Sequence, residues 1–189
     1  MKFYYKTKIP SPKNKKFIEK FFINKNLKLL VNLSKKQKLS VNQMIVNESY
    51  IPELDDLYNL YQYVLINKRT TIFEFGSGWS TLIFGLALKE LRDKFSKEVK
   101  LLRRNNPFEL FVIENDKKYL NITRNRIKKF NKYLNIKNPI KINYSLSDVE
   151  MTLFNNRICT QYKRLPLCNP DFIYLDGPDQ FDVKSDING

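Results

Sequence analysis

The chain has 189 residues, of which 42% are hydrophobic, and it carries a formal net charge of +15. This length and composition fit one globular domain with a buried core, and no run approaches the roughly 18 consecutive apolar residues of a membrane span. There is no histidine, which excludes the commonest general base and a mixed zinc site with the two cysteines, Cys159 and Cys168. The N-terminus lacks an apolar signal core, so we expect a cytoplasmic protein with two free thiols.

The positive charge raises the question of a nucleic-acid partner. Lysines occur in every segment, and the densest basic runs are residues 13–20, 35–38 and 97–104. No recognised nucleic-acid-binding motif accompanies these runs, which favours a solvated basic surface. A nucleic-acid partner is therefore not favoured, although it stays open.

Residues 1–48 predict a basic, helical N-terminal extension, and residues 49–189 predict the main domain. Phe17, Phe21 and Leu27 recur at helical spacing in the extension. Residues 49–68 predict an amphipathic helix with Pro52 at its first position, because apolar side chains recur there every three or four residues.

Residues 71–81, TIFEFGSGWST, predict a strand, a tight turn and the start of a helix. We expect Gly76 and Gly78 to adopt backbone angles that other residues avoid, and to leave room for a ligand. Ser80 and Thr81 can cap the helix, whose first N–H groups suit a negative group.

The rest of the chain predicts three further strands. Residues 109–114 read ELFVIE, a buried strand that ends in an acid, and Asp116 then caps a helix. Residues 140–144 alternate as a third strand, and residues 149–170 predict an irregular insertion. Residues 171–180, DFIYLDGPDQ, predict a strand buried on both faces that stops at a sharp turn.

These motifs, in this order, resemble those of the class I S-adenosylmethionine-dependent methyltransferases. The resemblance covers residues 52–189 and implies a Rossmann-like, three-layer α/β/α fold with a mostly parallel sheet in strand order 3-2-1-4. The later strands of that family would be missing. We therefore expect this chain to be a C-terminally truncated fragment of a longer protein, because an apolar edge strand without a partner is prone to aggregate.

The resemblance also implies which residues form the site. The cofactor S-adenosyl-L-methionine would be bound by Glu74, Gly76, Ser77, Gly78, Trp79, Ser80, Glu114, Asn115 and Asp148. Glu74 would favour the sulfonium and ammonium groups, Glu114 the ribose hydroxyls and Asp148 the adenine. Asp176 and Asp179 would be the catalytic residues.

Each assignment has an alternative reading from the residues alone. The glycine turn also suits a nucleotide phosphate, or a strand-to-helix connection without a ligand. Glu114 can instead be an acidic side chain at the N-terminus of the next helix, where the helix dipole favours a negative charge. Asp148 can be an ordinary loop residue.

A divalent metal ion at Asp176, Asp179 and Gln180 is chemically reasonable for oxygen ligands, but it is not favoured, and we assign no metal ligand. Asp179 can instead cap a helix over residues 182–187.

The sequence therefore predicts a methyltransferase that modifies an oxygen or nitrogen atom of a small molecule or sugar. The alternative is a truncated, non-catalytic module that binds the cofactor or a partner, with RNA methylation as a lesser option. The acceptor and the oligomeric state stay open.

Overall fold

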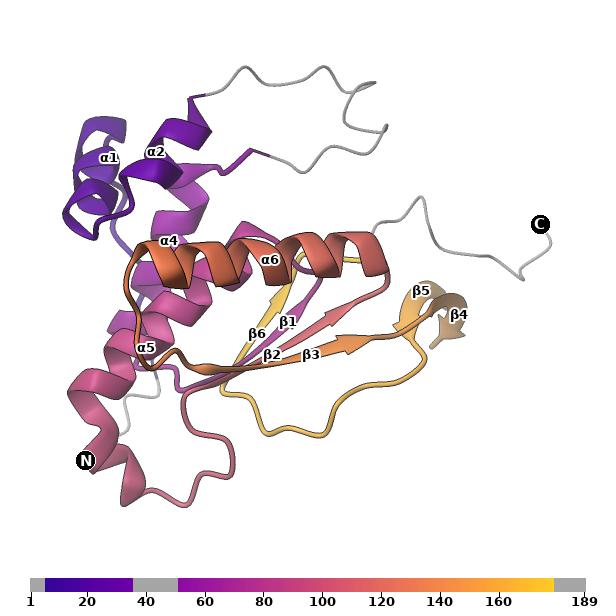
Figure 1. Ribbon diagram of the computed structural model, residues 1–189. Coiled ribbons are helices and arrows are strands. Elements are labelled where there is room, and N and C mark those ends of the chain that lie inside the picture. The colour runs from indigo at the N-terminus through magenta and orange to yellow at the C-terminus, as the bar shows by residue number, and fades with distance from the viewer. Residues whose placement is uncertain (1–5, 36–50, 179–189) are drawn as a thin grey trace.

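The computed structural model describes residues 6–35 and 51–178, which form an α/β fold (Figure 1). Its elements, in chain order, are α1 (Lys15–Asn24), α2 (Lys28–Ser34), α4 (Leu54–Ile66), β1 (Thr71–Phe75), α5 (Trp79–Lys100), β2 (Glu109–Glu114), α6 (Lys117–Tyr133), β3 (Lys141–Leu146), β4 (Val149–Phe154), β5 (Arg157–Tyr162) and β6 (Phe172–Leu175). No helix in these two ranges has both the length and the apolar character needed to cross a membrane.

Four parallel strands form the central sheet in the order β3-β2-β1-β6. Because β6 is the fourth parallel strand that the sequence predicts, the expected order 3-2-1-4 is confirmed. All four carboxyl ends meet at one edge of the sheet, which is where open α/β sheets bind their ligands. This edge is called the carboxyl edge below.

Helices α4, α5 and α6 cover one face of the sheet. Ile72, Leu110 and Val112 of that face belong to the same buried core as the three helices. The core also includes Ile18 and Phe22 of α1, so the N-terminal helices are built into the domain rather than appended to it. The predicted helical face is partly wrong, since Phe17 is exposed.

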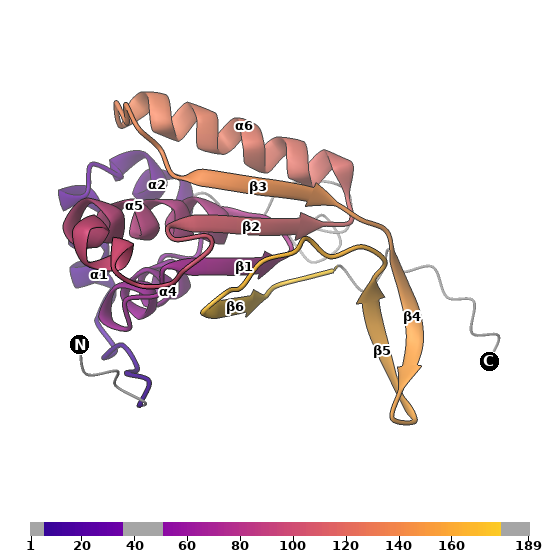
Figure 2. The same ribbon diagram turned by 90° about the horizontal axis from the view of Figure 1, so that it is seen from below.

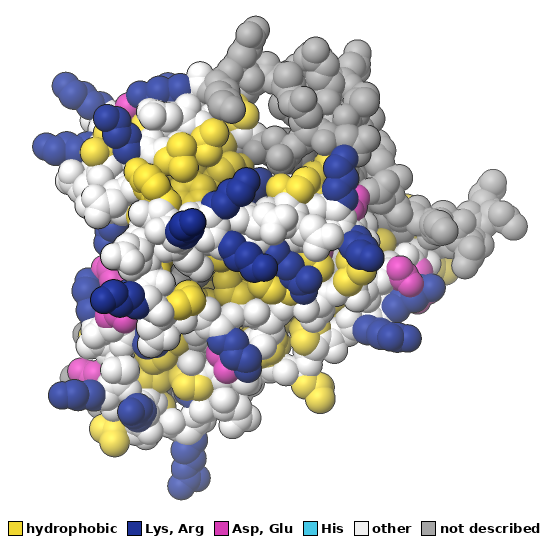
Figure 3. Space-filling view, in the orientation of Figure 1, with side chains coloured by type: hydrophobic (Ala, Val, Ile, Leu, Met, Phe, Trp, Pro, Cys, Tyr) yellow, Lys and Arg dark blue, Asp and Glu magenta, His cyan; other side chains and the backbone are white. Residues whose placement is uncertain are grey.

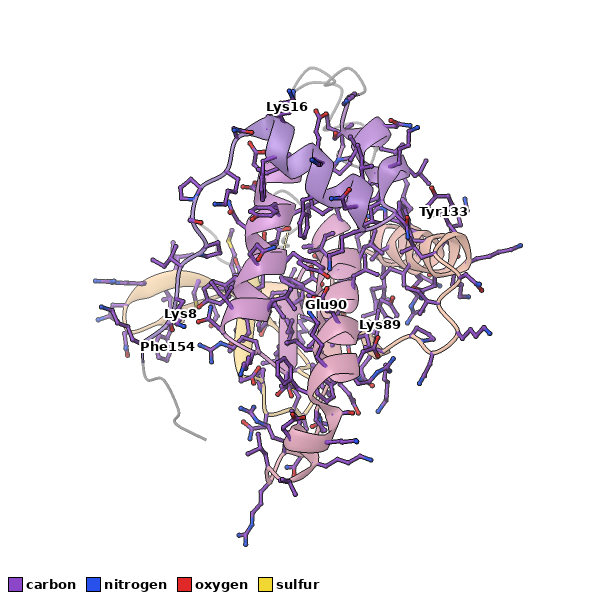
Figure 4. All side chains as sticks on the ribbon, turned by 90° about the vertical axis from the view of Figure 1, so that its left-hand side faces the viewer. Lys8, Lys16, Lys89, Glu90, Tyr133 and Phe154 are labelled. Atoms are coloured by element: carbon purple, nitrogen blue, oxygen red, sulfur yellow. The ribbon has the colours of Figure 1, made fainter. Side chains whose placement is uncertain are left out.

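Glu90 of α5 joins these helices at the outer side of the layer. Its carboxylate accepts hydrogen bonds from Lys25 after α1, from Tyr61 of α4 and from Lys94 one turn along α5 (Figure 4). Burial alone would raise the pKa of Glu90, but these donors lower it to about 2. One ionised side chain therefore holds three helices together.

The second face of the sheet is covered differently from the prediction. In the described ranges it packs against the β4–β5 hairpin and the irregular segment 163–170, where Val149, Tyr162 and Cys168 contact Phe73 and Phe111. The expected second helical layer is therefore not formed by these residues. Pro166 and Pro170 disfavour a helix in a connection of only nine residues, 163–171.

The prediction of an irregular segment is wrong for residues 149–162. Strands β4 and β5 pair antiparallel with Val149 opposite Tyr162 and Phe154 opposite Arg157. Asn155 and Asn156 connect them with positive φ angles of 50° and 60°, the conformation of a two-residue hairpin turn in which asparagine is favoured. The hairpin leaves the sheet at the carboxyl edge (Figure 2).

Asp171 fixes the opposite edge, where β1 and β6 begin. Its carboxylate accepts hydrogen bonds from the backbone N–H groups of Thr70 and Thr71 at 3.0 Å and pairs with Arg104 at 3.0 Å. The Thr70 hydroxyl adds a further hydrogen bond at 3.1 Å. This carboxylate is fully engaged in joining the two strands and the α5–β2 connection.

Candidate functional site

The glycine turn after β1 lies directly against the turn after β6. Gly76 has a φ of +92°, and a Cβ atom placed there would lie 3.0 Å from the backbone carbon and oxygen of Asp176. A Cβ on Gly177 would in turn lie 3.0 Å from the Cα of Gly76. Only glycine meets both the conformational and the steric requirement at position 76. The contact brings Asp176 to the glycine turn.

Gly78 has a different role from the predicted one. Its φ of −175° is extended backbone that any residue adopts, so the expectation of a special conformation holds only for Gly76. A Cβ at Gly78 would meet open space, with the Ser80 hydroxyl 3.9 Å away. The Gly78 N–H donates to the Thr81 hydroxyl at 3.0 Å, so Thr81 does part of the predicted capping. The space beside Gly78 is available to a ligand.

Glu74 lies under the first turn of α5 and is completely buried. The Ser80 hydroxyl, instead of capping the helix, donates to Glu74 Oε1, whereas Oε2 has no hydrogen-bond partner. Burial raises the pKa of Glu74 to about 8, although the hydroxyl groups of Ser80 and Thr81 act to lower it. The nearby carboxylates of Asp176 and Glu114 add to the rise. Glu74 is therefore mostly protonated at neutral pH, and an adjacent cation would favour its ionised form.

Glu114 connects the end of β2 to the glycine turn. Its carboxylate accepts hydrogen bonds from the Ser77 hydroxyl at 2.8 Å and from the backbone N–H groups of Asn115 and Asp116 at 2.9 and 3.2 Å. Burial raises the pKa of Glu114. A carboxylate has about four acceptor positions, so one is left for a ligand hydroxyl. Asp116 caps α6, as predicted.

The other predicted residues lie around this centre. Asp176 follows β6 at the surface, and burial of its carboxyl group together with the nearby Asp56 raises its pKa. Asp148 is exposed at the base of the hairpin, in a connection of only two residues between β3 and β4. Trp79 stacks under the Arg126 guanidinium at 3.9 Å. Asp179 and Gln180 lie outside the described residues.

Two residues near the site were missed by the sequence analysis. Asp56, in the first turn of α4, acts electrostatically on Asp176. Tyr162, at the end of β5, is buried beside Phe75, with ring centroids 5.6 Å apart. Neither follows a motif, and the only available signal was the Asn-Asn turn, which predicts the hairpin that carries Tyr162.

Within residues 6–35 and 51–178, no group of three or more His, Cys, Asp or Glu side chains has an arrangement suited to a metal ion. The proposed oxygen ligands Asp179 and Gln180 are not part of these ranges, so the metal hypothesis stays a prediction.

The described residues contain four buried side-chain polar atoms without a hydrogen-bond partner, and three of them lie at the carboxyl edge: Glu74 Oε2, Asn115 Oδ1 and the Tyr162 hydroxyl. The fourth, Arg69 Nε, lies before β1. Buried polar groups are normally satisfied, so each such atom needs an explanation, and a bound ligand is one. The surroundings combine backbone N–H groups, carboxylates and the open side of Gly78. Such groups can interact with a ligand that carries both a cationic centre and hydroxyl groups.

Comparison with known proteins assigns no function to the site, so its interpretation rests on the geometry described above. No protein-family model and no curated protein matches the chain.

The contrast between the two glycines is testable. Replacing Gly76 with alanine should lower the free energy of unfolding by about 1–3 kcal/mol, because alanine disfavours a positive φ and its Cβ meets the Asp176 backbone. The matched Gly78→Ala variant should lose less than about 1 kcal/mol, the cost of a weaker helix cap. Urea unfolding measures both, and equal losses would contradict the assigned geometry.

A second prediction concerns pH. The folded chain holds the Glu74 proton more tightly than the unfolded chain, with a pKa of about 8 against an ordinary 4.5. The resulting stabilisation should be complete below the ordinary value and disappear as the pH rises through about 8. The slope for one proton approaches about 1.4 kcal/mol per pH unit.

Urea unfolding between these two pH values should show this decline in the wild type. The Glu74→Gln variant should show a flatter profile, because Glu114 and Asp176 are then the remaining carboxyl groups of the site with raised pKa values. Identical pH profiles for the two proteins would rule out the assigned protonation of Glu74.

Proposed function

We propose that this protein binds S-adenosylmethionine at the carboxyl edge and transfers its methyl group to an oxygen or nitrogen atom of a small molecule or sugar. The observation that carries the proposal is the clustering of orphaned polar atoms, Glu74 Oε2 and Asn115 Oδ1 among them, around a glycine turn with an open side. The family resemblance of the motifs supports the same assignment.

The residues of the turn would bind the two ends of the ligand differently. The carboxylate of an amino acid suits the N–H groups at the start of α5. Its ammonium group and a sulfonium suit Glu74, whose ionised form an adjacent cation favours. Glu114, with one acceptor position left, would accept a hydrogen bond from a ribose hydroxyl. Ser77 orients Glu114 through its 2.8 Å hydrogen bond.

The bound cofactor would supply an electrophilic methyl group, and the protein would position the acceptor against it. Asp176 is held beside the glycine turn by the backbone contact with Gly76. Its raised pKa makes its carboxylate a better proton acceptor than an ordinary aspartate. Asp176 would therefore take the proton that the acceptor hydroxyl or amine loses.

Calorimetric titration with S-adenosylmethionine and S-adenosylhomocysteine tests the cofactor site directly. The wild type should bind both with a Kd on the order of micromolar, or about −8 kcal/mol. Gly78→Arg should abolish binding because its side chain would occupy the open side of the turn. Glu114→Gln should weaken binding about 10-fold or more, since it removes a charged acceptor.

Thermal unfolding of the same variants provides the control for folding. Glu114→Gln keeps an oxygen for the backbone N–H groups of Asn115 and Asp116, so its melting temperature should stay close to that of the wild type. If the folded wild type shows no heat with either ligand, the proposed function fails.

A second function, binding of a polyanion such as RNA, is favoured by one observation. Helix α6 contains no acidic residue, and Figure 3 shows Lys and Arg side chains gathered over it. Five of its basic residues form no ion pair with any residue in the described parts of the chain: Arg124, Arg126, Lys128, Lys129 and Lys132. We propose this surface as the interaction site of a non-catalytic module, or as the docking site of an RNA acceptor.

Fluorescence anisotropy with a labelled single-stranded RNA tests the second function. Replacing Lys128, Lys129 and Lys132 with glutamine should weaken binding and reduce the slope of log K against log salt by about 2, or about 0.7 per lost phosphate contact. The control replaces Lys13, Lys16 and Lys20 near α1 in the same way. Equal effects of the two triple variants would show that net charge, not α6, governs binding.

A further inference from the structure

Tyr162 is a buried residue whose hydroxyl group donates no hydrogen bond within the described residues. Its side chain is 5% exposed, and its ring packs on Phe75 in the second-face core with Phe73 and Phe111. The hydroxyl is enclosed and has no hydrogen-bond partner in the described structure. Phenylalanine would fill the same space without leaving a buried polar group unsatisfied, so packing alone does not explain tyrosine.

The base of the hairpin fixes the position of this hydroxyl. The Lys163 N–H donates to the Asp148 carbonyl at 2.9 Å, and the Arg164 N–H donates to the Ser147 hydroxyl at 3.0 Å. The Ser147 N–H in turn donates to the Glu114 carbonyl at 3.0 Å. Three hydrogen bonds therefore connect the end of β5 to the end of β2, at the carboxyl edge (Figure 2).

The electrostatic surroundings place the hydroxyl next to the glycine turn. Burial raises the pKa of Tyr162, the Glu114 carboxylate raises it further, and the backbone N–H of Gly76 acts in the opposite direction. That N–H donates mainly to the Ile113 carbonyl at 2.8 Å and can act on the tyrosine only as a donor, so the proton of the Tyr162 hydroxyl still has no acceptor. The hydroxyl therefore lies near Gly76 of the glycine turn and near Glu114, the residue proposed to bind the ribose.

We propose that Tyr162 is a ligand-binding residue of this site. Its hydroxyl group would form a hydrogen bond with the same ribose that Glu114 binds. The inference rests on the proposed function. It makes the β4–β5 hairpin a wall of the site on the second face of the sheet, where no motif of the sequence indicated a ligand contact. Tyr162 and Glu114 would then hold the ribose from two sides, one as a neutral donor and one as a charged acceptor.

The test compares Tyr162→Phe with the wild type in calorimetric titrations with S-adenosylhomocysteine and 5′-methylthioadenosine. Loss of one neutral hydrogen bond should weaken binding of both about 5- to 10-fold, because both contain the ribose. The melting temperature without ligand should stay equal or rise, since the variant removes an unsatisfied buried group. Tyr133→Phe, at an exposed tyrosine of α6 (Figure 4), is the matched control and should change neither quantity.

Analogues of 5′-methylthioadenosine that lack the 2′- or the 3′-hydroxyl identify the contact. The effect of Tyr162→Phe should disappear for the analogue that lacks the bonded hydroxyl and persist for the other. Equal affinity of wild type and Tyr162→Phe for S-adenosylhomocysteine would overturn this inference alone. A wild type that binds neither ligand would overturn it together with the proposed function.

Discussion

The contact between Gly76 and the backbone of Asp176 and Gly177 is the constraint on which the site depends. Two strand ends approach so closely that neither glycine can carry a Cβ, and the Asp176 N–H donates to the Phe75 carbonyl at 2.9 Å. The Gly76 N–H meanwhile donates to the Ile113 carbonyl at the end of β2. The turn after β1 is therefore fixed from both sides, and Asp176 and Glu114 have defined places relative to it. A less tightly packed turn would leave these two carboxylates on independent loops.

The two edges of the sheet use their carboxylates in opposite ways. At the amino end, Asp171 is saturated by backbone N–H groups, a hydroxyl and Arg104, so nothing remains for a ligand. At the carboxyl end, Glu74 is more deeply buried yet keeps one oxygen without a partner. Unsatisfied buried groups destabilise a fold, and three of the four in the described residues lie at this edge, the fourth being Arg69 Nε before β1. Such a cluster is typical of a site where binding, rather than stability, determines the residues. Asp171 is the structural carboxylate, and Glu74 belongs to the site.

The sequence predicted the parts of this arrangement that depend on local patterns. Apolar runs ending in Glu114 and Asp176 identified β2 and β6, and the glycine turn identified β1. The strand order came from the family resemblance of these motifs. The hairpin was missed because the proline-containing segment that follows it dominated the interpretation of residues 149–170. Tyr162 could not be found at all, since its place beside Glu114 depends on hydrogen bonds between the hairpin and the end of β2. The two glycines looked equivalent in sequence, and only the packing of Asp176 distinguishes them.

The charge of the whole chain and the charge of the site have opposite signs, which bears on the acceptor. Asp176 and Glu114 lie at the glycine turn and Asp56 lies near Asp176, whereas basic side chains gather over α6. A cationic ligand is attracted to the carboxylates, and a polyanion is repelled from them even while the net charge of +15 draws it to the protein. An RNA acceptor would therefore have to present its reacting atom against local repulsion, after docking elsewhere on the surface. A neutral or cationic small molecule meets no such barrier, so the high positive charge does not by itself favour RNA as the substrate.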